Sequence, residues 1–181
     1  STFNSLATFA GNTGPANGPG IDSGSAPIRH YSWVEKIGGI FKTSIYLDLD
    51  GVAAAGTDKH VIGLAAGGSG ASYLGLITSA LNGAIFAAKM TCLEVPTGGS
   101  ADIDLYNAAE ATYGYGDALV SGSSTEYLII DGGGNWTNGM VKGGTTITFD
   151  TTSEYLYLVN GASSGAGEYD TGKFLIELWG V

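Results

Sequence analysis

The chain has 181 residues, of which 44% are hydrophobic, and a formal net charge of −10 from 17 acidic and 7 basic side chains. A chain of this length can bury a core without disulfides or metals, so we expect one domain. The acidic balance and the lack of any basic run exclude a binder of phosphate backbones. No stretch reaches the roughly 18 apolar residues of a membrane helix. We therefore expect neither nucleic acid nor a membrane as a partner.

The surface is predicted to be unusual. Charged residues make up 13% of the chain, and 31 residues are glycine. An ordinary soluble domain has about 25% charged residues. Small uncharged residues therefore stand where Lys and Glu normally keep a monomer solvated, which predicts that other chains cover much of the exterior.

Residues 1–29 are predicted to form an extended N-terminal arm. They contain three of the four prolines and five glycines, without a periodic apolar pattern, so they cannot pack a core alone. The alternative is a tail without a role. The apolar side chains expected to dock on a neighbouring subunit are Phe3, Leu6, Phe9, Ile21 and Ile28. Phe3, Leu6 and Phe9 are the expected anchors, and Trp33 is expected to pin the arm to the domain.

Residues 30–181 are predicted to form an all-β domain, an antiparallel β-sandwich of jelly-roll type. Apolar and polar residues alternate with period two, as where Ile45 and Leu47 share one face and Asp48 falls on the other. The expected strands are 41–50, 59–65, 72–78, 84–95, 101–107, 125–131, 145–150, 154–159 and 173–179. Glycine-rich turns separate them. A hairpin turn is expected at 81–83, and 108–124 fits either a helical turn or a long loop.

The run YLDLDGV at 46–52 resembles the nucleophile loop of haloacid-dehalogenase phosphatases. That loop must follow a parallel strand, and parallel strands need crossover helices. The sequence offers no helix after Gly51, and Ser121 stands where a second metal-binding acid is needed. We expect no catalytic residue and no enzyme. Asp48 and Asp50 are predicted to be outward residues of a strand that enters an Asp50–Gly51 turn.

Other chemical motifs are weak. His30 and His60 lack companions at zinc-ligand spacing, and Cys92 is expected to be a buried, inert thiol. The loop 131–135 has the composition of a calcium loop without the EF-hand spacing. We expect no metal and no cofactor, with Ca²⁺ at this loop as an open alternative.

Three aromatic residues remain as binding candidates. Tyr113, Tyr115 and Trp136 fall in predicted loops and could stack on sugar rings. The favoured interpretation is that they pack within loops or interfaces, and sugar stacking is the alternative.

Several strand phrases carry a resemblance. They are KTSIYLDL (42–49), YLGLIT (73–78), NGAI (82–85), MTCLEVP (90–96), DIDLY (102–106), EYLYL (154–158) and GKFLIE (172–177). Together they are similar to small virion proteins of marine tailed bacteriophages, over residues 40–181.

The resemblance implies a non-enzymatic capsid decoration (cement) protein on the outer capsid surface. Its partners would be the major capsid protein and copies of itself, with a trimer as the first expectation. The alternative is a carbohydrate- or receptor-binding module of a fibre or tail tip, which would use Tyr113, Tyr115 and Trp136.

Overall fold

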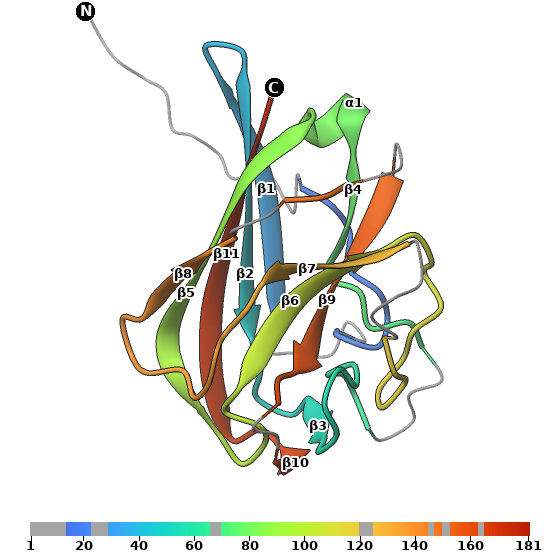
Figure 1. Ribbon diagram of the computed structural model, residues 1–181, viewed down its shortest axis with the longest axis vertical. Helices are drawn as coiled ribbons and strands as arrows, with labels where there is room; N and C mark the ends of the chain where they lie inside the picture. The colour runs from blue at the N-terminus through green and yellow to red at the C-terminus, as the bar shows by residue number, and fades with distance from the viewer. Residues whose placement is uncertain are drawn as a thin grey trace, which may run out of the picture.

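Two antiparallel β-sheets pack face to face (Figure 1). The computed structural model describes residues 14–22, 29–65, 70–119, 125–144, 147–149, 153–162 and 165–181. The five-stranded sheet has the order β1 (His30–Ile37), β2 (Ile40–Asp48), β11 (Thr171–Gly180), β5 (Ile85–Thr97) and β8 (Val141–Gly143). The four-stranded sheet has the order β4 (Gly75–Thr78), β9 (Ser153–Asn160), β6 (Ile103–Ala108) and β7 (Glu126–Ile130). A small ribbon pairs β10 (Ala166–Glu168) with β3 (Ala53–Ala55). The expected all-β, antiparallel class is confirmed.

Strand pairs are nested in the sequence. β6 pairs with β7, β5 with β8, β4 with β9, and β2 with β11. From β2 to β11, the strands of the two large sheets alternate between them at every step except β6 to β7. Each sheet is therefore assembled from segments that lie far apart in the sequence.

The core lies between the two sheets. It takes Ile45 and Leu47 from β2 and Phe174 from β11, and these face Leu105 and Leu156 of the four-stranded sheet; all five are fully buried. Burying one such side chain contributes about 1.5–3 kcal/mol. The period-two alternation seen in the sequence is the pattern that places these residues on the inner faces.

A one-turn helix, α1 (Ser79–Asn82), links the two sheets where a hairpin turn was expected. The Thr78 side chain accepts a hydrogen bond from the Leu81 N–H, and the Asn82 side-chain oxygen accepts one from the Thr78 N–H (2.9 Å). Asn82 also donates to the Thr43 hydroxyl at 2.6 Å. The hairpin interpretation is therefore wrong, because these local side-chain bonds stabilise a helical turn instead.

Some strand predictions are also wrong. The region 59–65 forms isolated bridges at His60, Val61 and Gly63 instead of a strand. In the region 145–150, the described part, 147–149, is not a strand. The short strands β3, β8 and β10 were not predicted. The described part of 108–124 that follows β6 forms a loop.

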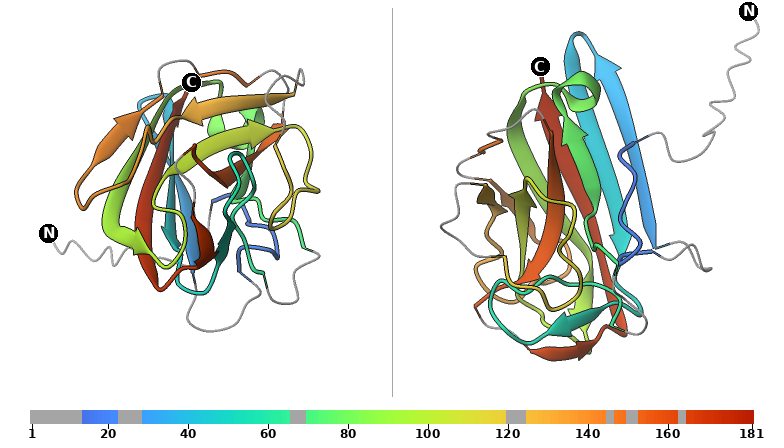
Figure 2. Two further views of the ribbon diagram at one scale, coloured as in Figure 1. Left: turned by 60° about the horizontal axis from the view of Figure 1, so that its bottom comes forward. Right: turned by 90° about the vertical axis from the view of Figure 1, so that its right-hand side faces the viewer.

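Residues 14–22 pack against the rest of the same chain (Figure 2). The Gly14 N–H donates to the Ser32 carbonyl at 3.0 Å, and Gly20 donates to Ala71 at 2.9 Å. Ile21 is fully buried in the main core. The boundary expected at residue 29 is therefore wrong for this segment, and Ile21 does not serve to dock on a neighbour.

The other residues proposed for the N-terminal arm fall into two groups, those outside the described residues and Trp33. Phe3, Leu6, Phe9 and Ile28 lie outside the described residues. Trp33 is half-buried on β1, and a Cβ at Gly14 would come within 2.5 Å of the Trp33 backbone nitrogen. Gly14 is thus held against the backbone at Trp33, on the edge strand of the five-stranded sheet.

Replacing Ile21 with Ala tests whether residues 14–22 belong to the folded domain. The change should lower the free energy of unfolding by about 2–5 kcal/mol, because it removes a fully buried side chain. Ile37→Ala is the control, since Ile37 is 69% exposed and its loss should cost less than about 0.5 kcal/mol. Equal effects in urea denaturation would contradict the assignment.

Candidate functional site

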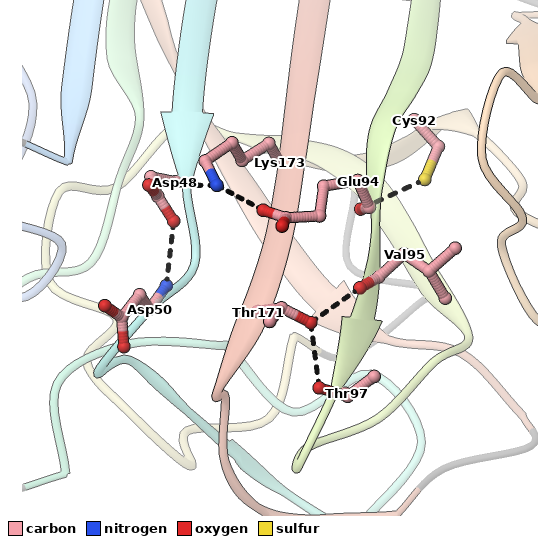
Figure 3. Close-up of polar contacts among 8 residues, drawn as sticks. All are labelled: Asp48, Asp50, Cys92, Glu94, Val95, Thr97, Thr171 and Lys173. Carbon is pink, nitrogen blue, oxygen red and sulfur yellow. Dashed lines mark hydrogen bonds and ion pairs between the residues drawn. The ribbon is translucent and has the colours of Figure 1, made fainter.

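Asp48 and Asp50 lie where an antiparallel strand enters a turn. β2 is antiparallel to both of its neighbours, β1 and β11, so these carboxylates do not follow a parallel strand as in a haloacid-dehalogenase loop. The Asp50 N–H donates to the Asp48 carboxylate at 3.2 Å (Figure 3). Gly51 has a φ of 80°, which only glycine adopts readily. The expected Asp50–Gly51 turn is confirmed.

A charged cluster crosses three adjacent strands beside this turn. Lys173 on β11 lies 3.7 Å from the Asp48 carboxylate on β2 and donates a hydrogen bond to Glu94 on β5 (Figure 3). The bond to Glu94 raises the pKa of Lys173, and the charge of Asp48 adds to the effect. The lysine is therefore held as a cation between two carboxylates.

An open depression of about 600 Å³ adjoins Lys173. Its lining residues are Leu93, Glu94, Val95, Thr97, Asn138, Thr171 and Lys173. The hydroxyls of Thr97 and Thr171 lie 2.8 Å apart, and Thr171 also donates to the Val95 carbonyl at 2.8 Å. An irregularity in the β5–β11 register lies at Leu93, which is 44% exposed. The depression therefore combines apolar side chains with hydroxyl groups that already bind each other.

The depression is part of a larger surface, which we call the outer face. It comprises the outward side chains of the five-stranded sheet: Tyr31, Trp33, Tyr46, Leu93, Val95, Val141, Leu175 and Trp179. The strand register aligns Tyr31, Tyr46, Leu175, Thr91 and Val141 in one row across the sheet. Tyr31 is 48% exposed and Val141 is 53% exposed. Apolar side chains on this face thus remain accessible.

The opposite surface of the sandwich differs. The outward side chains of the four-stranded sheet, such as Tyr157 and Val159, are buried with Val61 and Leu119 in a second apolar cluster. Loop residues of the same chain cover this side. On the outer face of the five-stranded sheet, by contrast, apolar side chains remain exposed and available to a partner.

Ion pairs join most of the charged side chains on the outer face. Glu177, which is 5% exposed, lies 2.6 Å from Lys42 and also pairs with Lys89. Burial acts to raise the pKa of Glu177, but the two lysines outweigh it and the pKa is lowered. With Lys173, Asp48 and Glu94, the paired groups comprise three bases and three acids, and exposed Glu35, opposite Lys42 across β1 and β2, adds one further acid. A surface so close to neutral on a chain of net charge −10 favours contact with other proteins.

The residues proposed to stack on sugars are not brought together. Trp136 is 1% exposed, donates from its indole nitrogen to the Ile103 carbonyl at 2.8 Å, and packs edge-on against Phe174 in the core. Trp136 is therefore a packing residue, as the packing interpretation of the three aromatic residues predicts, and is not available to stack on a sugar. Tyr113 packs against Tyr157 on the other side of the four-stranded sheet, with ring centroids 5.7 Å apart.

The Tyr113 hydroxyl is also occupied. It donates to the Glu126 carboxylate at 2.6 Å, and this bond raises the pKa of Tyr113 to about 12. Tyr115 is half-buried in the same loop. These aromatic residues therefore act mainly in packing, and an exposed aromatic side chain on the outer face is Tyr31, which the sequence analysis did not select. The alternation within 30–37 was the signal that could have found it.

The other motif residues are separate from this face. Cys92 is buried as expected and donates to the Glu94 carbonyl at 3.3 Å. His30 is buried beside Asp22, and desolvation lowers its pKa. His60 is half-buried in the loop that pairs with Asn160. In the ranges that the structure describes, no three His, Cys, Asp or Glu side chains gather as a metal would require.

A second open depression, of about 420 Å³, is acidic. Asp58, Asp102, Asp104 and Asp131 line it together with Lys59. The Gly132 N–H donates to Asp104 at 2.8 Å, and the Gly134 N–H donates to Asp102 at 3.1 Å, so carboxylates hold the loop 131–135, for which Ca²⁺ was the open alternative. Burial, followed by the nearby carboxylates, raises the pKa of Asp104 to about 6.

Replacing Asp104 with Asn tests the raised pKa of Asp104. A folded-state pKa above the ordinary 3.8 means that the native protein loses stability as pH rises from about 4 to about 6. The Asn side chain carries no charge and still accepts from Gly132. In thermal and urea unfolding, the variant should therefore exceed the wild type by about 1–2 kcal/mol at pH 7.5.

The advantage of Asp104→Asn should disappear near pH 4, where the wild-type carboxyl is protonated. Asp50→Asn is the control, because this side chain is exposed and its removal should leave the pH profile unchanged. A difference between Asp104→Asn and the wild type that stays constant from pH 4 to 7.5 would refute the raised pKa.

Comparisons with known proteins give no match, whether to family models, to curated proteins or to solved structures. Among helices in the described part of the chain, none combines the length and apolar character of a membrane span.

Proposed function

We propose that this chain is a non-enzymatic structural protein of a phage particle, a decoration (cement) protein on the outer capsid surface. The observation that carries the proposal is the outer face, where most charged groups form ion pairs and Tyr31, Leu93, Val95 and Val141 are at least 36% exposed. The resemblance of the strand phrases to small virion proteins of marine tailed phages is the reason for proposing a phage particle as the location. The partners are then the major capsid protein and further copies of this chain.

We propose in addition that the sandwich is a jelly roll. Four nested strand pairs support this: β2 with β11, β4 with β9, β5 with β8, and β6 with β7. In a jelly roll, such nested pairs wrap around the core, so that the two sheets are built from strands of both the first and the second half of the domain. Viral capsid domains use this architecture often, although the fold alone does not define function.

The outer face suits attachment to a shell. Its aromatic and aliphatic side chains provide apolar area, which stabilises a contact by about 25 cal/mol per Å² before the cost of association. The charged groups around Glu177 and Lys173 are already paired, so docking does not bury these ions without a partner. Many weak contacts of this kind, repeated over a capsid, add up to a reinforced shell.

The N-terminal arm is proposed as a second attachment. Because residues 14–22 are part of the folded domain, the arm is residues 1–13, with Phe3, Leu6 and Phe9 as its anchors. The arm would join the domain at Gly14, whose N–H donates to the Ser32 carbonyl on the edge strand β1 of the five-stranded sheet. We propose that the arm and the outer face engage the same neighbouring surface.

Truncation tests the arm. A protein that starts at Gly14 keeps Ile21 and the hydrogen bonds of residues 14–22, so its melting temperature should stay within a few degrees of the full chain. It should nevertheless co-sediment poorly with phage heads assembled without this protein. A triple Ala variant at Phe3, Leu6 and Phe9 is the matched control of full length. Equal retention of all three proteins would disprove the role of the arm.

Charge substitution tests the outer face. Val141→Lys and Leu93→Lys should each weaken binding to heads by about tenfold, because each places an unpaired cation in the contact. Leu128→Lys is the control, since Leu128 is 39% exposed but lies on the four-stranded sheet. If the control weakens binding as much, the outer face is not the docking surface. Binding to a glycan panel in place of heads would favour the receptor-binding alternative.

A further inference from the structure

One side of the sandwich is crossed by residues 14–22, which we call the strap (Figure 2). On one flank of the strap lies β1, the edge strand of the five-stranded sheet, where the Ser32 hydroxyl donates to the Pro15 carbonyl at 2.8 Å. On the other flank lies the chain that leads into β4, the edge strand of the four-stranded sheet, where the Gly18 N–H donates to the Tyr73 carbonyl at 2.8 Å. The strap therefore bridges the edges of the two sheets.

Individual contacts, not a strand ladder, hold the strap in place. None of its residues is in a strand or helix. The Gly20 N–H donates to the Ala71 carbonyl at 2.9 Å, and the Gly20 carbonyl accepts from the Leu64 N–H at 2.7 Å. Ile21 anchors the strap in the main core. A segment held in this way can open locally at a lower cost than the paired sheets.

His30 lies beside the strap on the inner face of β1. It is 2% exposed, and its cross-strand partner is Leu47, a core residue. Ser32, which bonds the strap, is two residues further along the same face of β1. Neither ring nitrogen of His30 has a partner at hydrogen-bond geometry in the described part of the chain. The ring is thus enclosed without the acceptors that a charged imidazolium needs.

The charged group whose field acts on His30 is Asp22, the last residue of the strap. The Asp22 carboxylate also accepts from the Arg29 N–H at 3.2 Å. Other titratable or charged groups on the neighbouring elements are engaged elsewhere: the Arg29 guanidinium donates to the Asp50 carbonyl, Asp48 lies near Lys173 on the outer face, and the Tyr73 ring packs against Tyr155.

Burial dominates the protonation of His30. Desolvation lowers the pKa of His30, and the Leu74 backbone and the charge of Asp22 act in the opposite direction without outweighing it. When the strap opens, the ring returns to water and its pKa to the ordinary 6.5. The open state then binds a proton more readily than the closed state, so a fall in pH below about 6.5 favours opening.

We propose that His30 is a proton sensor for the strap: in acid, residues 14–22 detach from the edges of the two sheets while the sheets stay paired. A protonated ring reaches water on the side of the strap, since its partner Leu47 is fixed in the core between the sheets. Opening exposes Ile21 and the inner face beneath it. The inference concerns the domain alone and does not depend on attachment to a capsid.

Amide hydrogen exchange of the wild-type chain, followed by NMR at about pH 7.5 and about pH 5, tests the proposal. After correction for the intrinsic pH dependence of exchange, the amides of Gly18, Gly20 and Leu64 should lose protection at least about tenfold at the lower pH. An opening that takes up one proton becomes up to about tenfold more favourable for each pH unit below 6.5. The amides of Leu49 and Trp136, which donate within the body of the domain, should keep their protection.

Variants at the two histidines of the chain identify the sensor. His30→Phe and His30→Gln cannot take up the proton, so the strap of either variant should show the same protection at both pH values. His60→Gln is the matched control, because His60 lies in a loop that pairs with Asn160, and it should respond as the wild type does. It also leaves one imidazole signal, whose titration midpoint should lie below 6.5.

The wild type and His60→Gln alone can overturn the proposal, even if neither His30 variant folds. Strap protection in the wild type that is the same at both pH values would do so, as would a His30 midpoint at or above 6.5. Equal loss of protection in the strap and in the body would show global unfolding and reject a local opening. A pH response that persists in a folded His30 variant would assign the sensor to another group.

Discussion

The packing of the two sheets against each other is the constraint on which the rest of the molecule depends. Each sheet has an apolar inner face that must be kept from water, so Ile45, Leu47 and Phe174 pack against Leu105 and Leu156. This contact fixes the register of every paired strand, because a shift by one residue would turn the apolar set outward. It also decides which residues are left outside. Tyr46 and Lys173 lie on the outer face because their neighbours in sequence are needed in the core.

The two outer surfaces then diverge. Loops of the chain bury the outward side of the four-stranded sheet, where Tyr157 and Val159 join a second apolar cluster. The five-stranded sheet keeps its outward side chains accessible and balances its charges in ion pairs around Glu177 and Lys173. In such an arrangement the ion pairs fix the charged side chains and leave little net charge on the surface. We consider this more suitable for adhesion than for catalysis. Our proposal of a decoration protein follows from this asymmetry.

Sequence periodicity was informative wherever a strand is long and half-buried. It located β2, β9 and β11 closely, because Ile45, Leu156 and Ile176 recur with polar partners at a spacing of two. It missed β3, β8 and β10, which have three residues each and exist because a partner strand lies beside them. A three-residue segment has too few positions to show any period.

Features that depend on distant partners were the least predictable. Trp136 follows a glycine-rich turn, which suggested exposure, but its burial depends on the Ile103 carbonyl 33 residues earlier. Ile21 stands alone among prolines and glycines, so no pattern marked it as a core residue. The outer face could be predicted in part, since alternation places Lys42 and Tyr46 outward. The balance of its charges could not be predicted, because the ion pairs depend on how β2, β11 and β5 pair in the sheet.

The position of β11 has a consequence for biosynthesis. This strand follows all the others in the sequence, yet it lies in the middle of its sheet, between β2 and β5. Until it emerges from the ribosome, the backbone edges of β2 and β5 that it later joins have no partner and can bind other unfinished chains. Closure of the sheet must therefore wait until β11 has left the ribosome, and contacts of such long range also slow folding. Nascent chains held by a chaperone until that moment would be protected from aggregation.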